Sequence, residues 1–252
     1  MIFLEYLEPI GDVCAFEHFL DDHQRFRQFL AVLAHFNAIQ PCGDYAAQLD
    51  RGDAAEDLRG AVSTLDSIWE RAREGELRHA VQRLCSASRD NLPLLRALAN
   101  GIIEPAARME NGLGHRDYYE DSTAWRRGKR ELLIIDLESV GLAPRFYDVA
   151  RHLGAPDDIE PRCLPREELA RYYLDQYVRW GGRPIALESF LEDIHLLWMV
   201  CKFTMLFFPS HRALDGRVDW TEDRELARQE ARRDLYVDLA RFLRQVGWDG
   251  QA

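Results

Sequence analysis

Acidic residues, a histidine and the ends of predicted strands converge between Gly114 and Glu138, in the part of the sequence best supplied with groups that could do chemistry. Asp117 lies in a loop that enters a short strand-like run, and Asp136 follows four aliphatic residues in the next one. If the two runs form a hairpin, both carboxylates come to the same end of it. Two carboxylates placed in this way can bind a divalent cation, or one can act as a base while the other binds the metal.

The same residues also have structural uses. Asp117 could cap a turn, and Asp136 could simply mark the end of a strand. His115, two residues before Asp117, could be a buried histidine whose polar atoms are satisfied within the protein. The spacing alone leaves the chemical and the structural interpretation open.

A β-hairpin is the element that must position the two acids. The strand-like runs 122–126 and 131–137 flank Arg127, Gly128 and Lys129. Because a glycine at the tip favours a tight turn, the sequence predicts a hairpin over residues 122–137.

Helices are predicted for most of the remaining chain. Apolar residues recur at steps of three and four between residues 15 and 39, as on the buried face of one or two amphipathic helices. Residues 2–7 predict a short strand before Pro9 and Gly11, and we expect it to lie as a lone edge strand. Further helices are predicted over residues 54–73, 77–87, 92–108, 145–152, 166–180, 187–208 and 221–246. The fold class is therefore mainly α (α+β), with a small β-hairpin.

The composition is that of a folded, acidic protein. The 252 residues are 47% hydrophobic and 30% charged, and 43 acidic against 32 basic residues give a net charge of −11. This charge argues against nucleic acid or an anionic membrane as the main partner. The first residues lack the features of a secretory signal, so we expect a cytoplasmic protein. The five cysteines are not spaced as in a zinc site or a disulfide framework and predict structural thiols.

Three motifs around the hairpin occur together in one known family. His115-Arg116-Asp117 is followed, nineteen residues after the aspartate, by Asp136 within the run IIDLE. Residues 141–150 then read GLAPRFYDVA. This arrangement resembles the catalytic core of the aminoglycoside phosphotransferase and choline kinase-like family. The resemblance implies a protein kinase-like fold.

The resemblance also implies roles for individual residues. Asp117 would be the base or orienting group for a substrate hydroxyl, and Asp136 would hold Mg²⁺ against the phosphates of ATP. His115 would brace the catalytic loop, and Asp148 would hydrogen-bond back to the same loop. The phosphate acceptor would be a hydroxyl group of a small molecule.

The position five residues after Asp117 departs from the family pattern. The family has a metal-binding Asn or Gln there, whereas this chain has Ser122. A serine hydroxyl is a poorer oxygen ligand, and the neighbouring Asp121 is an alternative. The sequence predicts Asp136 and Ser122 as metal ligands and leaves the contribution of Ser122 open.

The first residues of the chain resemble another part of the kinase fold. Residues 3–7 are similar to the hinge strand between the two kinase lobes, which implies that Glu5, Tyr6 and Leu7 contact the nucleotide. In the family, the glycine-rich loop and the phosphate-binding lysine precede this strand, and neither of the two lysines in this chain replaces that lysine. We therefore expect a kinase-like C-terminal lobe whose N-terminal lobe is absent or is supplied by a separate chain.

These observations predict one kinase-like lobe over residues 1–252. It would contain a hinge-like strand at 1–8, catalytic and metal-binding loops at 112–141 and a helical subdomain at 142–252. The favoured function is transfer of the ATP γ-phosphate to a small-molecule hydroxyl, with negligible transfer expected from the isolated chain. The alternatives are a degenerate kinase-like protein that binds without transferring phosphate, and an unrelated helical binding protein with a chance motif.

Overall fold

The computed structural model describes residues 13–15, 22–56, 58–60, 92–119, 122–126, 131–158 and 160–214. The chain divides into two compact units, one formed by Met1–Gly52 with Glu110–Leu197 and the other by Asp53–Met109 with Trp198–Ala252. The described residues are mostly helical and include small antiparallel sheets, which confirms the predicted mainly α class.

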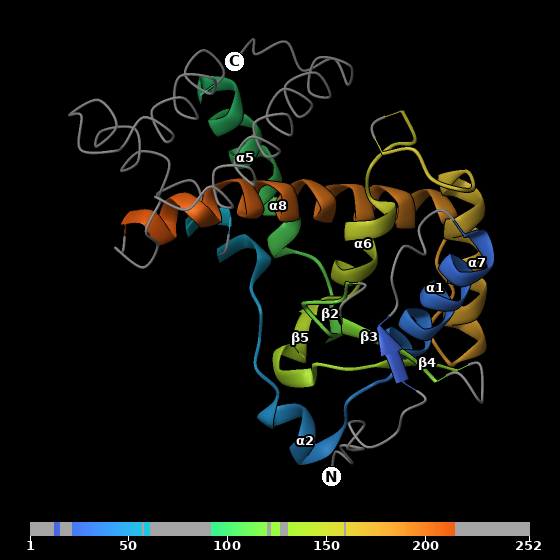
Figure 1. Ribbon diagram of the computed structural model, residues 1–252. Helices are drawn as coiled ribbons and strands as arrows, with labels where there is room; N and C mark the ends of the chain where they lie inside the picture. Colours follow the sequence, from blue (N-terminus) through green and yellow to red (C-terminus); the bar gives the residue numbers. More distant parts are fainter. Residues whose placement is uncertain are drawn as a thin grey trace. The chain divides into compact units, whose positions relative to one another are not determined.

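Two long helices of the first unit, α1 (His23–Ala38) and α7 (Arg166–Arg179), pack against each other (Figure 1). We expected one or two helices over residues 15–39; Ala15 instead lies in a strand, and residues 16–21 lie outside the described residues. Asp22 caps α1, because its carboxylate accepts hydrogen bonds from the amides of Gln24 (3.0 Å) and Arg25 (3.2 Å). The buried face of α1 includes the apolar residues Phe26, Phe29, Leu30, Leu33 and Ala34.

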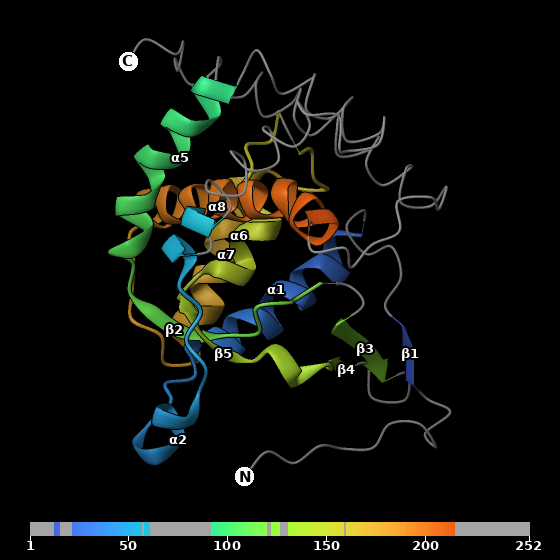
Figure 2. The same ribbon diagram turned by 90° about the vertical axis from the view of Figure 1, so that its left-hand side faces the viewer.

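The predicted hairpin is confirmed as part of a three-stranded antiparallel sheet. Strands β3 (Thr123–Arg126) and β4 (Glu131–Ile134) pair in a register that sets Ala124 opposite Leu133. A third strand, β1 (Val13–Ala15), pairs with β3, and Figure 2 shows the two side by side. The sequence did not predict β1, because three residues are too few to show an alternating pattern. The strand predicted at residues 2–7 lies outside the described residues.

The structure has a second sheet, which the sequence did not predict. One of its strands precedes the loops of Asp117 and Asp136 in the sequence, and the other follows them. Its strands are β2 (Asn111–Gly114) and β5 (Gly141–Pro144). The short segment 50–52, which follows helix α2 (Gly43–Gln48), runs along β5. The Leu142 amide donates to the Asp50 carbonyl (2.7 Å), and the Gly52 amide donates to the Leu142 carbonyl (2.6 Å).

Helices follow this second sheet, as the sequence predicted. They are α6 (Tyr147–Leu153), α7 and α8 (Leu187–Leu214), and α5 (Leu92–Ala107) belongs to the second unit. A 3₁₀ helix, η2 (Leu137–Ser139), follows Asp136. None of the helices that the structure describes is long and apolar enough to span a membrane. The helices predicted at 77–87 and 221–246 lie outside the described part of the chain.

Candidate active site

The loop that carries Asp117 connects β2 to β3 and is held by a buried acid. Asp148, in the first turn of α6, accepts hydrogen bonds from the backbone amides of His115 (Oδ2, 2.8 Å) and Arg116 (Oδ1, 2.8 Å). Asp148 is fully buried. Burial raises the pKa of Asp148, and the amide donors and the charge of Arg151 offset part of that rise.

Other residues of α6 contact the same loop. His152 donates from Nε2 to the Tyr118 carbonyl (3.0 Å), and Arg151 Nη1 lies 3.6 Å from Asp117 Oδ1. The Arg151 guanidinium also lies over the ring of Tyr119, 4.7 Å from its centroid. Positions 148, 151 and 152 are three and four residues apart, so they share one face of the helix. One side of α6 therefore holds and orients the loop.

Two hydrogen bonds, one from a side chain and one between backbone groups, join the loop of Asp117 to the loop of Asp136. His115 donates from Nε2 to the Ile135 carbonyl (2.9 Å), and the Ile135 amide donates to the Ser122 carbonyl (2.9 Å). Asp136 follows directly, with left-handed backbone (φ 58°). The side chains of Asp117 and Asp136 are both exposed. The two acids therefore lie on neighbouring, directly bonded loops and are open to solvent.

Ser122 closes the turn that begins at Asp117. Its buried hydroxyl donates to the Asp117 carbonyl and accepts from the Tyr119 amide (3.3 Å). Whether this oxygen also binds a metal stays a prediction. Asp121, Glu5, Tyr6 and Leu7 lie outside the described residues.

The donor set at Asp136 suits Mg²⁺. This ion is commonly bound in proteins by one or two carboxylates together with waters and substrate phosphates, and an exposed carboxylate leaves room for those partners. Within the described ranges, no group of three or more His, Cys, Asp or Glu side chains is arranged to hold a metal by itself.

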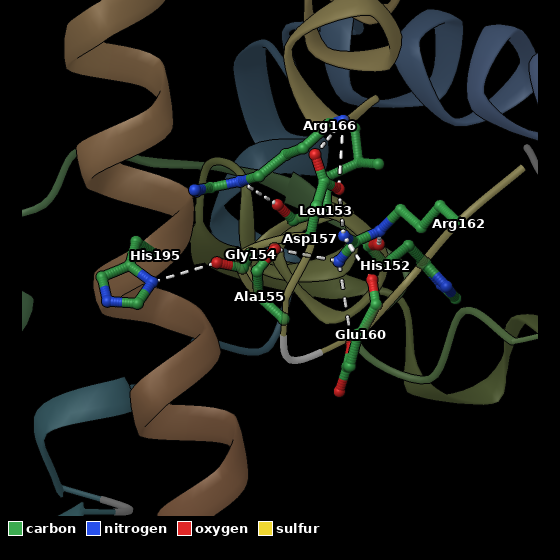
Figure 3. Close-up of polar contacts among 9 residues, drawn as sticks. All are labelled: His152, Leu153, Gly154, Ala155, Asp157, Glu160, Arg162, Arg166 and His195. Carbon is green, nitrogen blue, oxygen red and sulfur yellow. Dashed lines mark hydrogen bonds and ion pairs between the residues drawn. The ribbon is translucent and has the colours of Figure 1, made fainter. Parts of the chain in front are cut away.

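The far end of α6 is held by a buried arginine (Figure 3). Arg162 donates from Nε to the His152 carbonyl (2.7 Å) and from Nη2 to the Ala155 carbonyl (3.1 Å). It also forms an ion pair with Asp157 (3.1 Å). Burial lowers the pKa of Arg162, and its acidic neighbours oppose that effect.

Two further side chains donate to the carbonyls of Leu153 and Gly154, which lie between those of His152 and Ala155. Arg166, the first residue of α7, donates to Leu153 (2.7 Å), and His195 on α8 donates from Nδ1 to Gly154 (3.0 Å). Four consecutive carbonyls, those of residues 152–155, thus accept hydrogen bonds from side chains at this end of the helix (Figure 3). These contacts fix α6 between α7 and α8.

Sequence reasoning missed several residues of the site. Arg151 and His152 could have been found, because they follow Asp148 at three and four residues on a predicted helix. Arg116 was noted only as part of a motif. Asp50, whose carboxylate accepts from Arg116 Nη1 (2.9 Å), carries no signal in the sequence because its partner is 66 positions away.

Comparison with known proteins agrees with the predicted resemblance. Residues 7–186 match the model of the phosphotransferase enzyme family. The fold is similar to that of a spectinomycin phosphotransferase in complex with ADP and spectinomycin, with a TM-score of 0.57, 14% identity, and coverage of 87% of this chain and 63% of that chain. It is also similar to an ethanolamine kinase of Plasmodium vivax, with a TM-score of 0.55, 13% identity and coverage of 94% and 65%.

Both neighbours have the protein kinase-like fold, and at such identities the likeness concerns the fold alone. The matched part spans less than two thirds of the length of either neighbour. No curated protein matches the sequence.

Proposed function

The chain belongs to the phosphotransferase enzyme family, and we propose that it transfers the γ-phosphate of ATP to a hydroxyl group of a small molecule. One observation carries this proposal, the hydrogen bond from His115 Nε2 to the Ile135 carbonyl (2.9 Å). It joins the loop of Asp117 to the loop of Asp136. Phosphoryl transfer needs one group for the acceptor hydroxyl and another for the metal, on loops that are fixed relative to each other.

Asp117 is the proposed base or orienting group. Its carboxylate accepts the proton of the acceptor hydroxyl as that oxygen bonds to the γ-phosphorus and the bond to the β-phosphate oxygen breaks, which releases ADP. The Asp117 side chain is 57% exposed, so an acceptor can reach it. Arg151, at 3.6 Å, limits the orientations that this carboxylate adopts.

Asp136 is the proposed ligand of Mg²⁺, which neutralises charge on the nucleotide phosphates when bound. His115 and Asp148 are proposed supports of the catalytic loop, because one binds the Ile135 carbonyl and the other binds two loop amides. The two hydrogen bonds of the Ser122 hydroxyl within the loop favour Asp136 as the main ligand.

The acceptor is proposed from chemistry and from the neighbours. A net charge of −11 favours a cationic small molecule over an anionic one. Spectinomycin and ethanolamine, which the two structural neighbours are named for, are therefore suitable first acceptors.

The test follows Mg·ADP binding to the purified chain by calorimetry. Because we expect negligible transfer from the isolated chain, the transfer of labelled phosphate from ATP to each acceptor is measured with the chain extended by a kinase-like N-terminal lobe. We expect Asp117→Asn to lower transfer by about 10³-fold while leaving Mg·ADP binding intact, because a general base contributes about 10²–10⁴-fold. Asp136→Asn should weaken Mg·ADP binding. Asp175→Asn, at an exposed position on α7, is the matched control. A chain that binds no Mg·ADP, or an Asp117→Asn variant with undiminished transfer, overturns the proposal.

A second candidate is a kinase-like protein that binds nucleotide without transferring phosphate. The observation that favours it is Ser122, whose hydroxyl is buried and engaged where the family has Asn or Gln. Mg·ADP binding that depends on Asp136, with no transfer to either acceptor even by the chain extended by a kinase-like N-terminal lobe, would support this candidate instead.

A further inference from the structure

Arg116, between His115 and Asp117, has an unusual backbone. Its φ is 67°, in the left-handed region that non-glycine residues rarely occupy. Such a conformation is kept only where several surrounding contacts hold the backbone in place. Residues of this kind concentrate at functional sites. The Arg116 amide is held by Asp148 Oδ1 (2.8 Å), which fixes the backbone from one side.

The side chain of Arg116 reaches the loop of the other acid. Its Nε donates to the carbonyl of Ser139 (2.6 Å), the last residue of η2. Its neighbour His115 donates to the carbonyl of Ile135 (2.9 Å). Two adjacent residues of one loop therefore bind the other loop on both sides of Asp136.

Asp50 fixes the other end of the Arg116 guanidinium. Its carboxylate accepts from Nη1 (2.9 Å), and this hydrogen bond and the charge of Arg116 lower the pKa of Asp50. The guanidinium also packs closely on Gly141, where a Cβ would lie 3.0 Å from Arg116 Cζ and 2.6 Å from the Asp50 carbonyl oxygen. The segment 50–52 is itself bonded to β5 through Leu142. Arg116 is thus clamped between three segments that are distant in sequence.

We propose that Arg116 is a positioning residue that sets the separation of the Asp117 and Asp136 carboxylates, with Asp50 as its anchor. The proposal rests on the proposed function, in which these two acids act on the hydroxyl and on the metal. A guanidinium can serve the Ser139 carbonyl and the Asp50 carboxylate at once, because its donors form a rigid fork. A lysine at the same position has one ammonium group and cannot reproduce both contacts with the same geometry.

The reason for a large functional effect is geometric. Among the described residues, the Arg116 side chain bonds to Ser139 and Asp50, not to the carboxylates of Asp117 and Asp136. It therefore acts on the turn that carries Asp136. A displacement of about 1 Å in a catalytic group can cost about 10²-fold in rate. Loss of Arg116 should therefore change the metal dependence of the reaction more than it changes overall stability.

The test compares Arg116→Lys, Arg116→Gly and Asp50→Asn with the full wild-type chain. Matched controls are Arg171→Lys, which alters an exposed arginine whose ion pair with Glu167 spans one helical turn, and Asp175→Asn. Glycine at 116 removes the side chain and also relieves the left-handed backbone, so its melting temperature should stay near that of the wild type. Amide hydrogen exchange over residues 135–142 reports whether the turn is held, independently of nucleotide. The Mg²⁺ concentration that gives half-maximal transfer, measured in the same variants extended by a kinase-like N-terminal lobe, reports the position of Asp136.

We expect faster exchange at 135–142 in both Arg116 variants, a smaller increase in Asp50→Asn, and none in the controls. The half-maximal Mg²⁺ concentration should rise by about tenfold or more in Arg116→Gly, with the Michaelis constant of the acceptor unchanged. Unchanged exchange overturns the proposal. Faster exchange with an unchanged Mg²⁺ dependence also overturns it, because Arg116 would then be a structural brace only. If the wild type binds no Mg·ADP, the proposed function fails, and the exchange experiment still decides whether Arg116 and Asp50 hold the turn.

Discussion

The two ends of α6 are held by opposite kinds of group. At the first turn, the carboxylate of Asp148 accepts two amide hydrogen bonds from the loop that carries Asp117. At the last turn, Arg162, Arg166 and His195 donate to backbone carbonyls. The last carbonyls of a helix lack partners within it, so donors are needed at that end. A helix of seven residues is too short to be stable alone, and both sets of contacts support it.

The two ends of α6 also differ in how many side chains form these hydrogen bonds. One carboxylate, that of Asp148, serves both loop amides, so no second acceptor replaces it. At the other end, three side chains divide four carbonyls among them. We infer that the first end controls the geometry of the site and the second end controls stability. Substitutions at the two ends should therefore affect different measurements.

The largest effect is expected for Asp148→Asn. Asparagine keeps one oxygen acceptor but turns an NH₂ group toward the second loop amide, which leaves two donors facing each other. We expect phosphate transfer to fall by about 10²-fold or more because the loop moves. The unfolding free energy should fall by only about 1–2 kcal/mol, since a neutral side chain also avoids the burial cost that raises the pKa of Asp148. Transfer assays and urea unfolding measure the two effects, and transfer at the wild-type rate would contradict this view of the first end.

Arg162→Met should show the reverse pattern. Methionine fills a similar length but removes the donors to the carbonyls of His152 and Ala155 and the ion pair with Asp157. The Arg162 side chain is only 7% exposed, so water has little access to this region. Without the arginine, these carbonyls would lose hydrogen-bond donors that water could not readily replace. We expect the unfolding free energy to fall by about 2 kcal/mol. The turnover of the folded fraction should stay within about twofold of the wild type, and an equal loss of turnover and stability would remove the contrast between the ends.

The sequence predicted the parts of the fold whose patterns are local. The hairpin was found because a glycine lies at the tip between two strand-like runs, and α1 and α7 were found from their apolar spacing. The strands β2 and β5 were missed because Asn111–Gly114 and Gly141–Pro144 contain glycine and proline and show no alternation. Their pairing is set by close approach of backbone, which side-chain patterns do not record.

The site divides in the same way. Asp117, Asp136 and Asp148 lie in three motifs that follow one another in the sequence, so spacing and resemblance together predicted them as site residues. The contact of Arg116 with Asp50 spans 66 positions, and that of His195 with Gly154 spans 41. Such contacts depend on how the segments pack, and a single sequence contains no pattern that pairs them.

Arg166→Lys should have a smaller effect than Arg162→Met. Arg166 donates to the carbonyls of Leu153 (2.7 Å) and Leu191 (3.0 Å), and a lysine can serve one of them. We expect a loss of about 1 kcal/mol in the unfolding free energy, measured by urea unfolding. Arg171→Lys, an exposed change on the same helix, is the control and should be close to neutral. A loss in the control as large as that in Arg166→Lys would show that the contacts to α6 are not the cause.

The smallest effect is expected at His195, and it should depend on pH. Burial lowers the pKa of His195 below its usual 6.5, the charge of Arg166 adds to this, and the hydrogen bond to the Gly154 carbonyl opposes it. Between the folded and the unfolded pKa the unfolded chain binds more protons, so the stability that His195 contributes is complete above about pH 6.5 and is lost as the pH falls through the folded pKa. Asparagine can still donate an N–H to Gly154 but does not titrate. His195→Asn should therefore lower the unfolding free energy by less than about 1 kcal/mol at neutral pH and should lose stability less steeply than the wild type on acidification. Urea unfolding of both proteins across this range measures the difference, and parallel curves would show that His195 does not titrate against the end of α6.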